Sequence, residues 1–382
     1  MTADPYGGAD GLRAFRRELA AWLHEHDASF ARRAPGASLA DEVARTRANQ
    51  RQLWDADWLR YGWPGSVGGL GGSPLLRAAA AEEGAHRGFF YDTVFAVNEV
   101  LAPAIIDAAP DLAAAHITPY LRGAEDWCQG FSEPDAGSDL ASLRCRAVDD
   151  GDHWVVTGQK IWTSYAQFAS KMVLLARTGT TESRHRGITA LLVDMDAPGL
   201  TLRPLHAIND VAEFSETFFD DVRVPKDRVI GEVNGGWRVA MEILRSERGG
   251  IFWMLSIWLL DELQRLVGAA DLDAADDESL GRVFTSIAGV RARTWTTQHR
   301  LAAGSIEIPE TSIDKILMAT AEQELFDLAR ASLGGILEFA DGDGPATSRA
   351  EYMYSLAATI YGGTGEIQRN TVADQVLGLR SA

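Results

Sequence analysis

The sequence predicts an α+β protein of three domains: an N-terminal helical domain over residues 1–122, a central antiparallel β-domain over 123–228 and a C-terminal four-helix bundle over 229–382. Two observations support this prediction. The chain has 382 residues, enough for two or three domains of about 100 to 200 residues each. The spacing of its apolar residues changes from helical to alternating near Trp127, and returns to helical after Pro225.

The N-terminal stretch is rich in alanine and has the apolar spacing of amphipathic helices. Phe15, Leu19 and Leu23 recur every four residues, which places them on one helical face. Two segments rich in glycine and proline, 61–65 and 68–72, have too many turn-forming residues for helix. They predict a loop between two helical stretches.

Short β-branched or aromatic runs define the central domain. Gly, Asp and Pro separate them, as expected for strands joined by turns. The runs are Trp154-Val-Val-Thr, Met172-Val-Leu-Leu-Ala, Ile188-Thr-Ala-Leu-Leu-Val and Thr217-Phe-Phe. The polar segment 179–187 is expected to be an exposed loop between two of these strands.

The C-terminal domain opens with apolar residues on one expected helical face. They are Trp237, Met241, Leu244, Ile251, Leu255 and Trp258. Further helices are expected over 280–301, 312–333, 349–361 and 366–377.

Composition excludes several classes of protein. Hydrophobic residues make up 46 % of the chain and charged residues 24 %, which excludes disorder over most of its length. The net charge of −18, without a visible basic patch, argues against nucleic acid as a partner. The first residues lack the pattern of a secretory signal, and no apolar run approaches the roughly 18 residues of a membrane span. We therefore expect a cytoplasmic protein with no membrane span, in which Cys128 and Cys145 are reduced and structural.

The densest chemical signal is a loop of small and hydroxyl residues at the start of the central domain. It has the sequence Phe131-Ser-Glu-Pro-Asp-Ala-Gly-Ser-Asp-Leu-Ala-Ser. Such a loop offers backbone N–H groups and serine hydroxyls to an anionic or heteroaromatic ligand, although the same residues also make an ordinary turn. Two further motifs supply context: Gly158-Gln-Lys-Ile-Trp-Thr-Ser, and Tyr361-Gly-Gly-Thr-Gly-Glu-Ile-Gln-Arg-Asn. The last opens a helix whose N-terminal dipole favours negative charge.

Together these three segments resemble the acyl-CoA dehydrogenase family of flavoproteins. Gly62-Trp-Pro and Asp220-Asp-Val-Arg-Val-Pro extend the resemblance to nearly the whole chain, in the same order. The resemblance implies the acyl-CoA dehydrogenase fold, with FAD held between the β-domain and the C-terminal bundle. It also implies an acyl thioester substrate and an electron-accepting flavoprotein or similar partner.

Matched residue by residue, the resemblance implies roles for residues of all three motifs. Thr364 and Glu366 would begin the terminal helix beside the cofactor, and Ser138 would contact pantetheine or a phosphate. The Ser164 hydroxyl would bond to the reactive flavin nitrogen. The residues that would line the flavin are Gln129, Phe131, Ser132, Trp162 and Ser164. Burial habits alone are also compatible with Trp162 as a core tryptophan.

Dehydrogenation needs a carboxylate that removes the α-proton while hydride leaves the β-carbon for the flavin. In much of the family this glutamate directly follows the Ile-Tyr of the terminal motif, where this sequence has Gly362. A second family placement lies on the first helix after the β-domain, and matches Glu247. Glu247 lies three residues after Leu244 and four before Ile251, beside the expected apolar face.

This position favours a functional carboxylate over a solvated one. Burial against Phe252 and Trp253 would raise the pKa of Glu247 towards that of a useful base. Arg248 would orient the substrate carbonyl or its carrier. The structural alternative is an ion pair between Glu247 and Arg248 or another arginine.

Two family features are absent from the sequence. An acidic stretch, 270–278, replaces the Arg-x-x-Phe-Gly loop that usually reaches the FAD diphosphate across a subunit interface. Segment 339–345 replaces the Gln-x-x-Gly-Gly-x-Gly segment on the adenine side. Either FAD binds weakly or a related partner subunit supplies these contacts, as in hetero-oligomeric acyl-CoA dehydrogenases of actinobacteria; a homo-oligomer also stays open.

The leading hypothesis is therefore an FAD-dependent α,β-dehydrogenase of an acyl thioester carried by coenzyme A or an acyl carrier protein. Two alternatives remain: a flavin monooxygenase of the same fold, and a non-catalytic or cofactor-sharing subunit. Gly362 and Gly363 leave space that could admit a bulky acyl group, unless Trp253 or Trp258 fills it.

Overall fold

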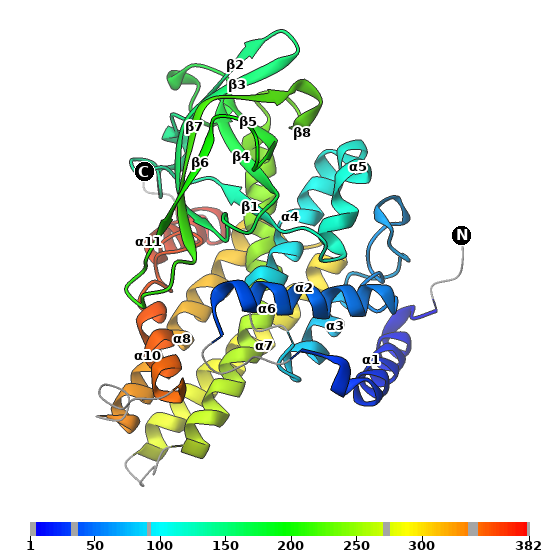
Figure 1. Cartoon of the computed structure of the whole chain (residues 1–382). Helices are drawn as coiled ribbons and strands as arrows, with labels where there is room; N and C mark the ends of the chain where they lie inside the picture. The colour runs from blue at the N-terminus through cyan, green and yellow to red at the C-terminus, as the bar shows by residue number, and fades with distance from the viewer. Residues whose placement is uncertain (1–4, 32–36, 90–92, 270–275, 335–342, 380–382) are drawn as a thin grey trace.

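The computed structural model describes residues 5–31, 37–89, 93–269, 276–334 and 343–379. Its strands gather at one end of the molecule and most of its helices at the other (Figure 1). The long helix α6 (Gly236–Ala269) runs from the sheet into the helical part. The order of helices, then strands, then helices confirms the predicted fold class.

The N-terminal part consists of helices packed around one apolar cluster. Phe15, Leu19 and Leu23 are all buried in that cluster, as their spacing predicts. Ser38 and Asp41 form a capping box that begins the second helix. The helices are α1 (Gly8–Glu25), α2 (Leu39–Asp55), α3 (Leu75–Ala85), α4 (Thr93–Ala108) and α5 (Pro110–Leu121).

The central part is one sheet with the strand order β6-β7-β3-β2-β4-β5-β8, and β1 pairs with β4. The strands are β1 (Trp127–Gly130), β2 (Arg146–Asp150), β3 (His153–Ser164), β4 (Lys171–Arg177), β5 (Ile188–Asp194), β6 (Leu200–Leu205), β7 (Phe214–Pro225) and β8 (Val229–Ile230). Most pairs are antiparallel, as predicted, but β1 runs parallel to β4 and a single residue pair joins β2 to β4 in parallel. The segment between β4 and β5 is a largely exposed 3-10 turn (Thr181–Gly187).

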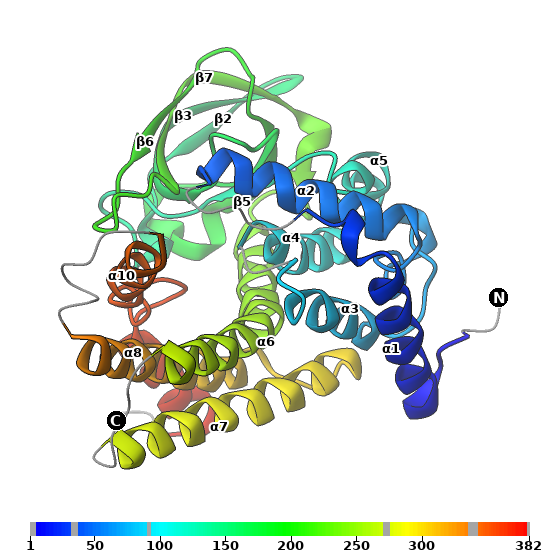
Figure 2. The same cartoon turned by 60° about the horizontal axis from the view of Figure 1, so that its bottom comes forward.

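The C-terminal part is a helical bundle in which α6, α7 and α8 lie alongside one another (Figure 2). Its other helices are α7 (Asp276–Ala302), α8 (Thr311–Leu333), α10 (Asp343–Ser355) and α11 (Gly365–Thr371), the last continued by a π-helical turn (Val372–Val376). The helix expected over 349–361 ends at Ser355, and turns lead from there to α11.

The single apolar face predicted for α6 is wrong. Its members Trp237, Leu244 and Trp258 are only partly buried, whereas Ile243 and Ile257 are fully buried. The reason is that α6 packs on several sides at once, against α3, α4, α7, α8 and β5. A helix surrounded by protein has no single buried stripe.

Two glycines bring α6 close to its neighbours. A Cβ added at Gly249 would collide with the Leu301 side chain of α7, and one added at Gly250 would lie 2.9 Å from the Cβ of Glu99 on α4. Both helices therefore approach the backbone of α6 just after Glu247.

No helix in the described ranges combines the length and apolar character needed to cross a membrane. Cys128 and Cys145 are both buried and free.

Candidate active site

Glu247 lies near the middle of α6, with its carboxylate against the turn that leads into α11. A Cβ added at Gly362 would lie 2.9 Å from Glu247 Oε1 and 3.8 Å from Lys315 Cε. Gly362 also has a φ of +62°, which L side chains rarely adopt. The Glu247 carboxylate thus occupies the space that a side chain at position 362 would need.

The space beside Gly363 is filled as well. A Cβ there would collide with the Gln368 amide, and would lie 3.8 Å from Arg248 Nη2. Gln368 Nε2 donates to the Gly362 carbonyl at 3.0 Å. The two glycines therefore give room to Glu247, Gln368 and Arg248, and the expectation of free space for a bulky acyl group is wrong at this turn.

Trp253 and Trp258, the two tryptophans considered as fillers of this space, both pack against other aromatic rings. Trp253 packs against Trp295, with ring centroids 5.0 Å apart, and its indole N–H donates to the Ala78 carbonyl at 3.4 Å. Trp258 faces Phe326, at 5.6 Å between centroids.

Burial raises the pKa of Glu247 above its ordinary value, although Arg248, Lys315 and a hydrogen bond from Gln129 act in the opposite direction. The direction matches the sequence-based expectation, and the Trp253 ring packs against Trp295. Within the described chain no direct ion pair joins Glu247 to Arg248. A buried carboxylate whose pKa is raised binds a proton more strongly than an exposed one.

Arg248 is 8 % exposed, and burial lowers the pKa of its guanidinium. Its Nη1 reaches Ser312 Oγ at 3.5 Å. Its Nε is buried and finds no partner among the described residues. Arg248 therefore retains an unused donor beside Glu247.

The two β-domain motifs meet in space. The Ile161 N–H donates to the Ser132 carbonyl at 3.0 Å. Ser132 and Ser164 are half-buried, and Phe131 is buried. Gln129 hydrogen-bonds to Glu247, and its Oε1 is buried with no partner among the described residues. The structure thus joins the predicted flavin-side residues to the predicted base through Gln129.

Trp162 is 58 % exposed and has a φ of +60°. Its ring meets only the edge of Phe214, with centroids 5.9 Å apart. The alternative that Trp162 is a core tryptophan is therefore wrong. An exposed indole held by a rare backbone conformation is suited to face a planar ligand.

A buried ion pair, which the sequence analysis missed, supports the Phe131 loop. Lys160 is fully buried, and its ammonium donates to the Phe131 carbonyl at 3.0 Å and to Glu133 at 2.8 Å. Glu133 also accepts from the backbone N–H groups of Arg144 and Cys145. Both residues belong to the quoted motifs, so the signal was present in the sequence.

The remaining predicted residues are Thr364, Glu366 and Ser138. Thr364 caps α11, with its hydroxyl accepting from the Ile367 N–H at 3.3 Å, and Glu366 is exposed in the first turn. Ser138 is exposed on its loop. The described residues show no contact between Ser138 or Glu366 and the other predicted site residues.

Comparisons with known proteins fit this arrangement. The model of the acyl-CoA dehydrogenase middle domain matches residues 128–222, and that of the C-terminal domain matches 234–377. Acyl-CoA dehydrogenase IpdE1 of Mycobacterium tuberculosis (strain ATCC 25618 / H37Rv) is 38 % identical, over 96 % of this chain and 98 % of its own length. The chain belongs to the acyl-CoA dehydrogenase family.

Solved structures agree with this membership. A structure described as "Tcur3481-Tcur3483 steroid ACAD" is 26 % identical with a TM-score of 0.83, covering 98 % of this acyl-CoA dehydrogenase and 99 % of that chain. The ChsE4-ChsE5 complex of Mycobacterium tuberculosis is also 26 % identical, with a TM-score of 0.78 and full coverage of both chains.

Members of this family are FAD-dependent, and the residues of this dehydrogenase fit that cofactor. The exposed Trp162 indole offers a flat wall, while Ser132, Ser164 and the unpartnered Oε1 of Gln129 offer polar groups nearby. The two segments that depart from the family, 270–278 and 339–345, lie partly outside the described residues, so their predicted effect on FAD binding stays a prediction.

Three further residues of the dehydrogenase escaped the sequence analysis as site candidates. Lys315 is 1 % exposed, donates to the Ala358 carbonyl at 2.6 Å and lies 3.7 Å from the centre of the Tyr361 ring. The Tyr361 hydroxyl donates to Glu322 at 3.1 Å. A lysine and a glutamate seven residues apart, inside the apolar pattern of 312–333, were the available signal.

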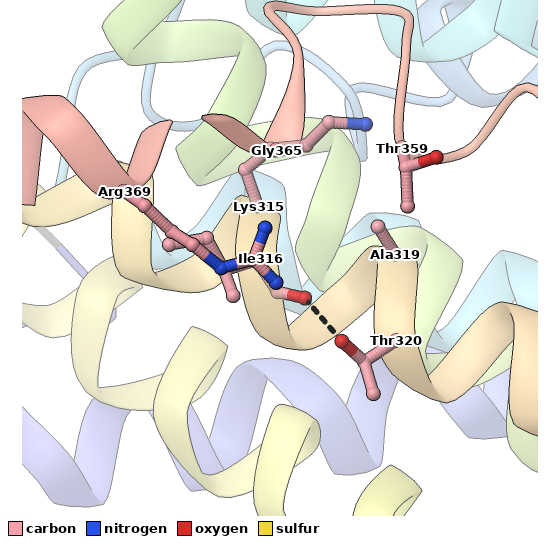
Figure 3. A pocket seen from close by; sticks show the side chains of 7 residues that line it. All are labelled: Lys315, Ile316, Ala319, Thr320, Thr359, Gly365 and Arg369. Carbon is pink, nitrogen blue, oxygen red and sulfur yellow. Dashed lines mark hydrogen bonds between the residues drawn. The ribbon is translucent and has the colours of Figure 1, made fainter. Parts of the chain in front are cut away.

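Lys315 also borders a small cavity between α8 and the terminal motif (Figure 3). The cavity is lined by Lys315, Ile316, Ala319, Thr320, Thr359, Gly365 and Arg369.

Proposed function

We propose that this protein catalyses the FAD-dependent α,β-dehydrogenation of an acyl thioester, with Glu247 as the base that takes the α-proton. The observation that supports this role is the 2.9 Å between Glu247 Oε1 and the Cβ position of Gly362. Much of the family carries its glutamate at the position of Gly362. A carboxylate that reaches the same place from α6 can serve the same substrate carbon.

Bound FAD would supply the hydride acceptor for the β-carbon. The protein's own residues have three tasks. Glu247 receives the α-proton on its carboxylate, and burial makes that carboxylate a stronger base. Arg248 directs its unused N–H towards the thioester or its carrier. Trp162, Ser132 and Ser164 hold the ring system of the cofactor.

A flavin monooxygenase of this fold would have no use for a carboxylate beside Gly362. A purely non-catalytic subunit would likewise leave the energetic cost of burying Glu247 without a purpose. The dehydrogenase accounts for both the carboxylate and the glycine.

The test is Glu247→Gln, which keeps size and hydrogen bonding but cannot accept the proton. Flavin bleaching is followed anaerobically with butanoyl-CoA, octanoyl-CoA and 3-cyclohexylpropanoyl-CoA. We expect the rate to fall by about 100- to 10,000-fold with unchanged flavin content. Glu242→Gln, on the same helix but in a partly exposed pair with Arg245, is the control. Bleaching at nearly the parental rate in Glu247→Gln would remove Glu247 as the base.

We further propose that a related subunit completes the cofactor site. Two similar solved structures carry names of two proteins each, Tcur3481-Tcur3483 and ChsE4-ChsE5. The acidic segment 270–278 opposes a diphosphate by its charge. Expression alone should give less than one FAD per chain, and co-expression with a related neighbouring protein should raise it. A homo-oligomer with one tight FAD per chain would contradict this proposal.

A further inference from the structure

We propose that Lys315 is a positioning residue for Glu247: its buried ammonium, held by the Ala358 carbonyl and the Tyr361 ring, keeps the Glu247 carboxylate ionised at its place beside Gly362. This inference rests on the proposed function, because it concerns the residue assigned as the base. It adds a second helix, α8, to the active site.

The geometry places both groups beside one point, the position that the Cβ of a side chain at 362 would occupy. Glu247 Oε1 and Lys315 Cε lie 2.9 Å and 3.8 Å from the same Cβ position at Gly362. Only a residue without a side chain lets the carboxylate from α6 and the lysine from α8 approach each other there. The absence of a side chain at Gly362 thus leaves room for both the Glu247 carboxylate and the Lys315 side chain.

Lys315 has little freedom to move away. It is 1 % exposed, it donates to the Ala358 carbonyl at 2.6 Å, and its ammonium lies 3.7 Å from the centre of the Tyr361 ring and 5.6 Å from that of Phe252. A cation over an aromatic face is stabilised when desolvated, which helps to keep this ammonium charged. Burial lowers the pKa of Lys315 to about 8, so it still carries its charge at neutral pH.

Other charged, titratable or polar groups also lie near this pair. Arg248 comes from α6 and Gln129 from β1. Glu322 comes from α8 and is held by the Tyr361 hydroxyl, and Tyr354 stands behind Tyr361 with ring centroids 6.1 Å apart.

Lys315 therefore stands between two carboxylates, Glu247 and Glu322. Burial raises the pKa of Glu322 to about 7, so this second carboxylate is partly protonated at neutral pH and competes only partly for the cation. Arg248 alone would have to balance Glu247 if Lys315 were neutral. A nearby cation within about 4 to 6 Å typically shifts the pKa of a carboxyl group by one to three units.

The experiment measures the protonation of Glu247 directly in the FAD-loaded protein. The infrared band of its carboxylic acid is obtained as the difference between each protein and the same protein carrying Glu247→Gln, across pH 5 to 9. The midpoint of that titration is compared for the parent, Lys315→Met and Glu322→Gln. Lys171→Met is the control, because Lys171 pairs with Asp194 in the β-domain.

We expect Lys315→Met to raise the midpoint by about one unit or more, because the ionised carboxylate loses its cation. Glu322→Gln should lower it by a smaller amount, because a competing anion is removed. Lys171→Met should leave it unchanged. A structural role alone would lower the melting temperature and leave the midpoint in place. A shift of less than about half a unit in Lys315→Met overturns the proposal; if that variant does not fold, an unchanged or raised midpoint in Glu322→Gln does so.

Activity separates this inference from the proposed function. The pH dependence of kcat/KM is measured with whichever of the three thioesters bleaches the parent fastest, and its acid limb is the fall in kcat/KM at low pH. If the limb moves with the infrared midpoint, both the base and its positioning cation are supported. If the midpoint moves and the limb does not, Lys315 still controls Glu247, but Glu247 is not the base.

Discussion

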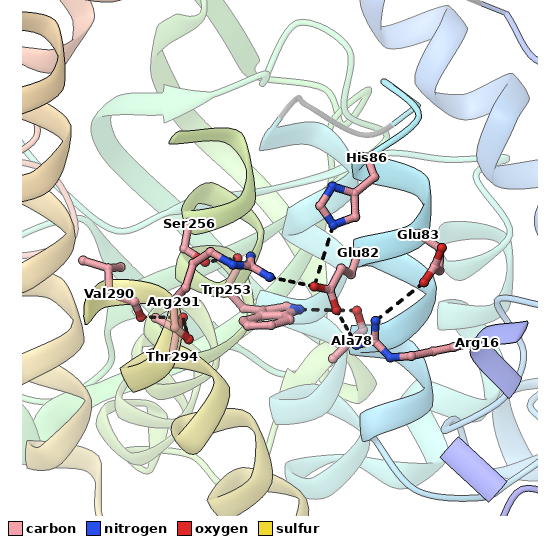
Figure 4. A network of polar contacts seen from close by, with 10 residues as sticks. All are labelled: Arg16, Ala78, Glu82, Glu83, His86, Trp253, Ser256, Val290, Arg291 and Thr294. Carbon is pink, nitrogen blue, oxygen red and sulfur yellow. Dashed lines mark hydrogen bonds and ion pairs between the residues drawn. The ribbon is translucent and has the colours of Figure 1, made fainter. Parts of the chain in front are cut away.

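Glu82 and Glu247 are both glutamates on helices, the first buried and the second partly buried, yet their surroundings differ in charge. Glu82 on α3 is 6 % exposed, and two arginines and a histidine lie around it: Arg291 at 2.7 Å, His86 at 3.8 Å and Arg16 (Figure 4). Glu247 has Lys315 and Arg248 nearby, but no direct ion pair with Arg248 among the described residues.

The pKa values of the two carboxyl groups move in opposite directions. Burial on its own would raise the pKa of Glu82, but His86, Arg16 and Arg291 outweigh it and lower the pKa to about 2. For Glu247 burial dominates and the pKa rises. A carboxylate surrounded by cations cannot take up a proton at neutral pH, whereas an undercompensated one can. The comparison separates a structural carboxylate from a candidate base.

The Glu82 network also joins parts of the chain that are far apart in sequence. Arg16 belongs to α1, Glu82 to α3 and Arg291 to α7. Glu82 lies 66 positions after Arg16, and Arg291 lies 209 positions after Glu82. Arg291 lies 4.8 Å from the centre of the Trp253 ring, and Arg16 lies 5.6 Å from that of Trp295. This network fastens the N-terminal helices to the C-terminal bundle.

The first test of this difference between Glu82 and Glu247 is the substitution Glu82→Gln. The amide cannot neutralise the partly buried Arg16 and Arg291, so Arg291 loses its carboxylate partner and Arg16 keeps only Glu83. We expect the free energy of unfolding to fall by about 3 to 5 kcal/mol at pH 7, measured by urea denaturation. Flavin bleaching per bound FAD should remain at the parental rate, the reverse of the result expected for Glu247→Gln.

Glu83→Gln is the matched control for Glu82→Gln. Glu83 is the next residue and also pairs with Arg16, at 3.6 Å, but its side chain is 20 % exposed. Its loss should cost less than about 1 kcal/mol. Equal effects of the two substitutions would mean that the charge network does not carry the stability assigned to it.

A second test uses Glu213, a buried carboxylate that faces Glu351 and Tyr354. Burial, followed by the charge of Glu351, raises the pKa of Glu213 to about 7. A raised folded-state pKa means that stability is lost as pH rises from about 4.5 to 7, at up to about 1.4 kcal/mol per unit. Glu82, with its lowered pKa, has the opposite sign: its contribution is present above about 4.5 and is lost as pH falls towards 2.

Glu213→Gln changes the free energy of unfolding relative to the parent. We expect this change to be more favourable at pH 8 than at pH 5, by up to roughly 3 kcal/mol. The measurement is the difference in free energy of unfolding between variant and parent at the two pH values. The structural cost of the amide is common to both and cancels. If the difference is the same at pH 5 and pH 8, the carboxyl group does not titrate between them.

Much of the architecture could be predicted because periodicity and motifs are local signals. The alternating runs mark the strands, and the family resemblance that the five motifs support leads to Glu247, Gln129 and Trp162 without any knowledge of contacts. The face of α6 was mispredicted for a physical reason, since a helix packed against several other elements buries residues all around. A single apolar face is expected only for a helix that has one side exposed to solvent.

The partners of the two glutamates could not be predicted from the sequence. Lys315 lies 68 positions after Glu247, and only the tertiary approach of α6 and α8 at Gly362 brings them together. For the same reason, the sequence suggested empty space at Gly362, where the structure has the Glu247 carboxylate. A glycine in a sequence shows that space is available beside the backbone, but it does not show which neighbouring side chain occupies that space.

The smallest expected effect, and the sharpest on geometry, comes from Gly362→Ala compared with Gly304→Ala. The two glycines have nearly the same left-handed φ, +62° and +61°, so alanine imposes a similar backbone cost of about 1 kcal/mol at each. They differ in what the new Cβ meets: nothing within 4 Å at Gly304, but Glu247 Oε1 at 2.9 Å at Gly362.

Both variants should therefore lose similar stability, measured by urea denaturation, while only Gly362→Ala displaces the carboxylate. Displacing a base by a fraction of an ångström to 1 Å typically slows its reaction by roughly 10- to 100-fold. We expect that loss in the anaerobic bleaching rate of Gly362→Ala and an unchanged rate in Gly304→Ala. If the two variants bleach equally fast, the carboxylate does not depend on the missing side chain at position 362, and the link between the glycine and the base on α6 is wrong.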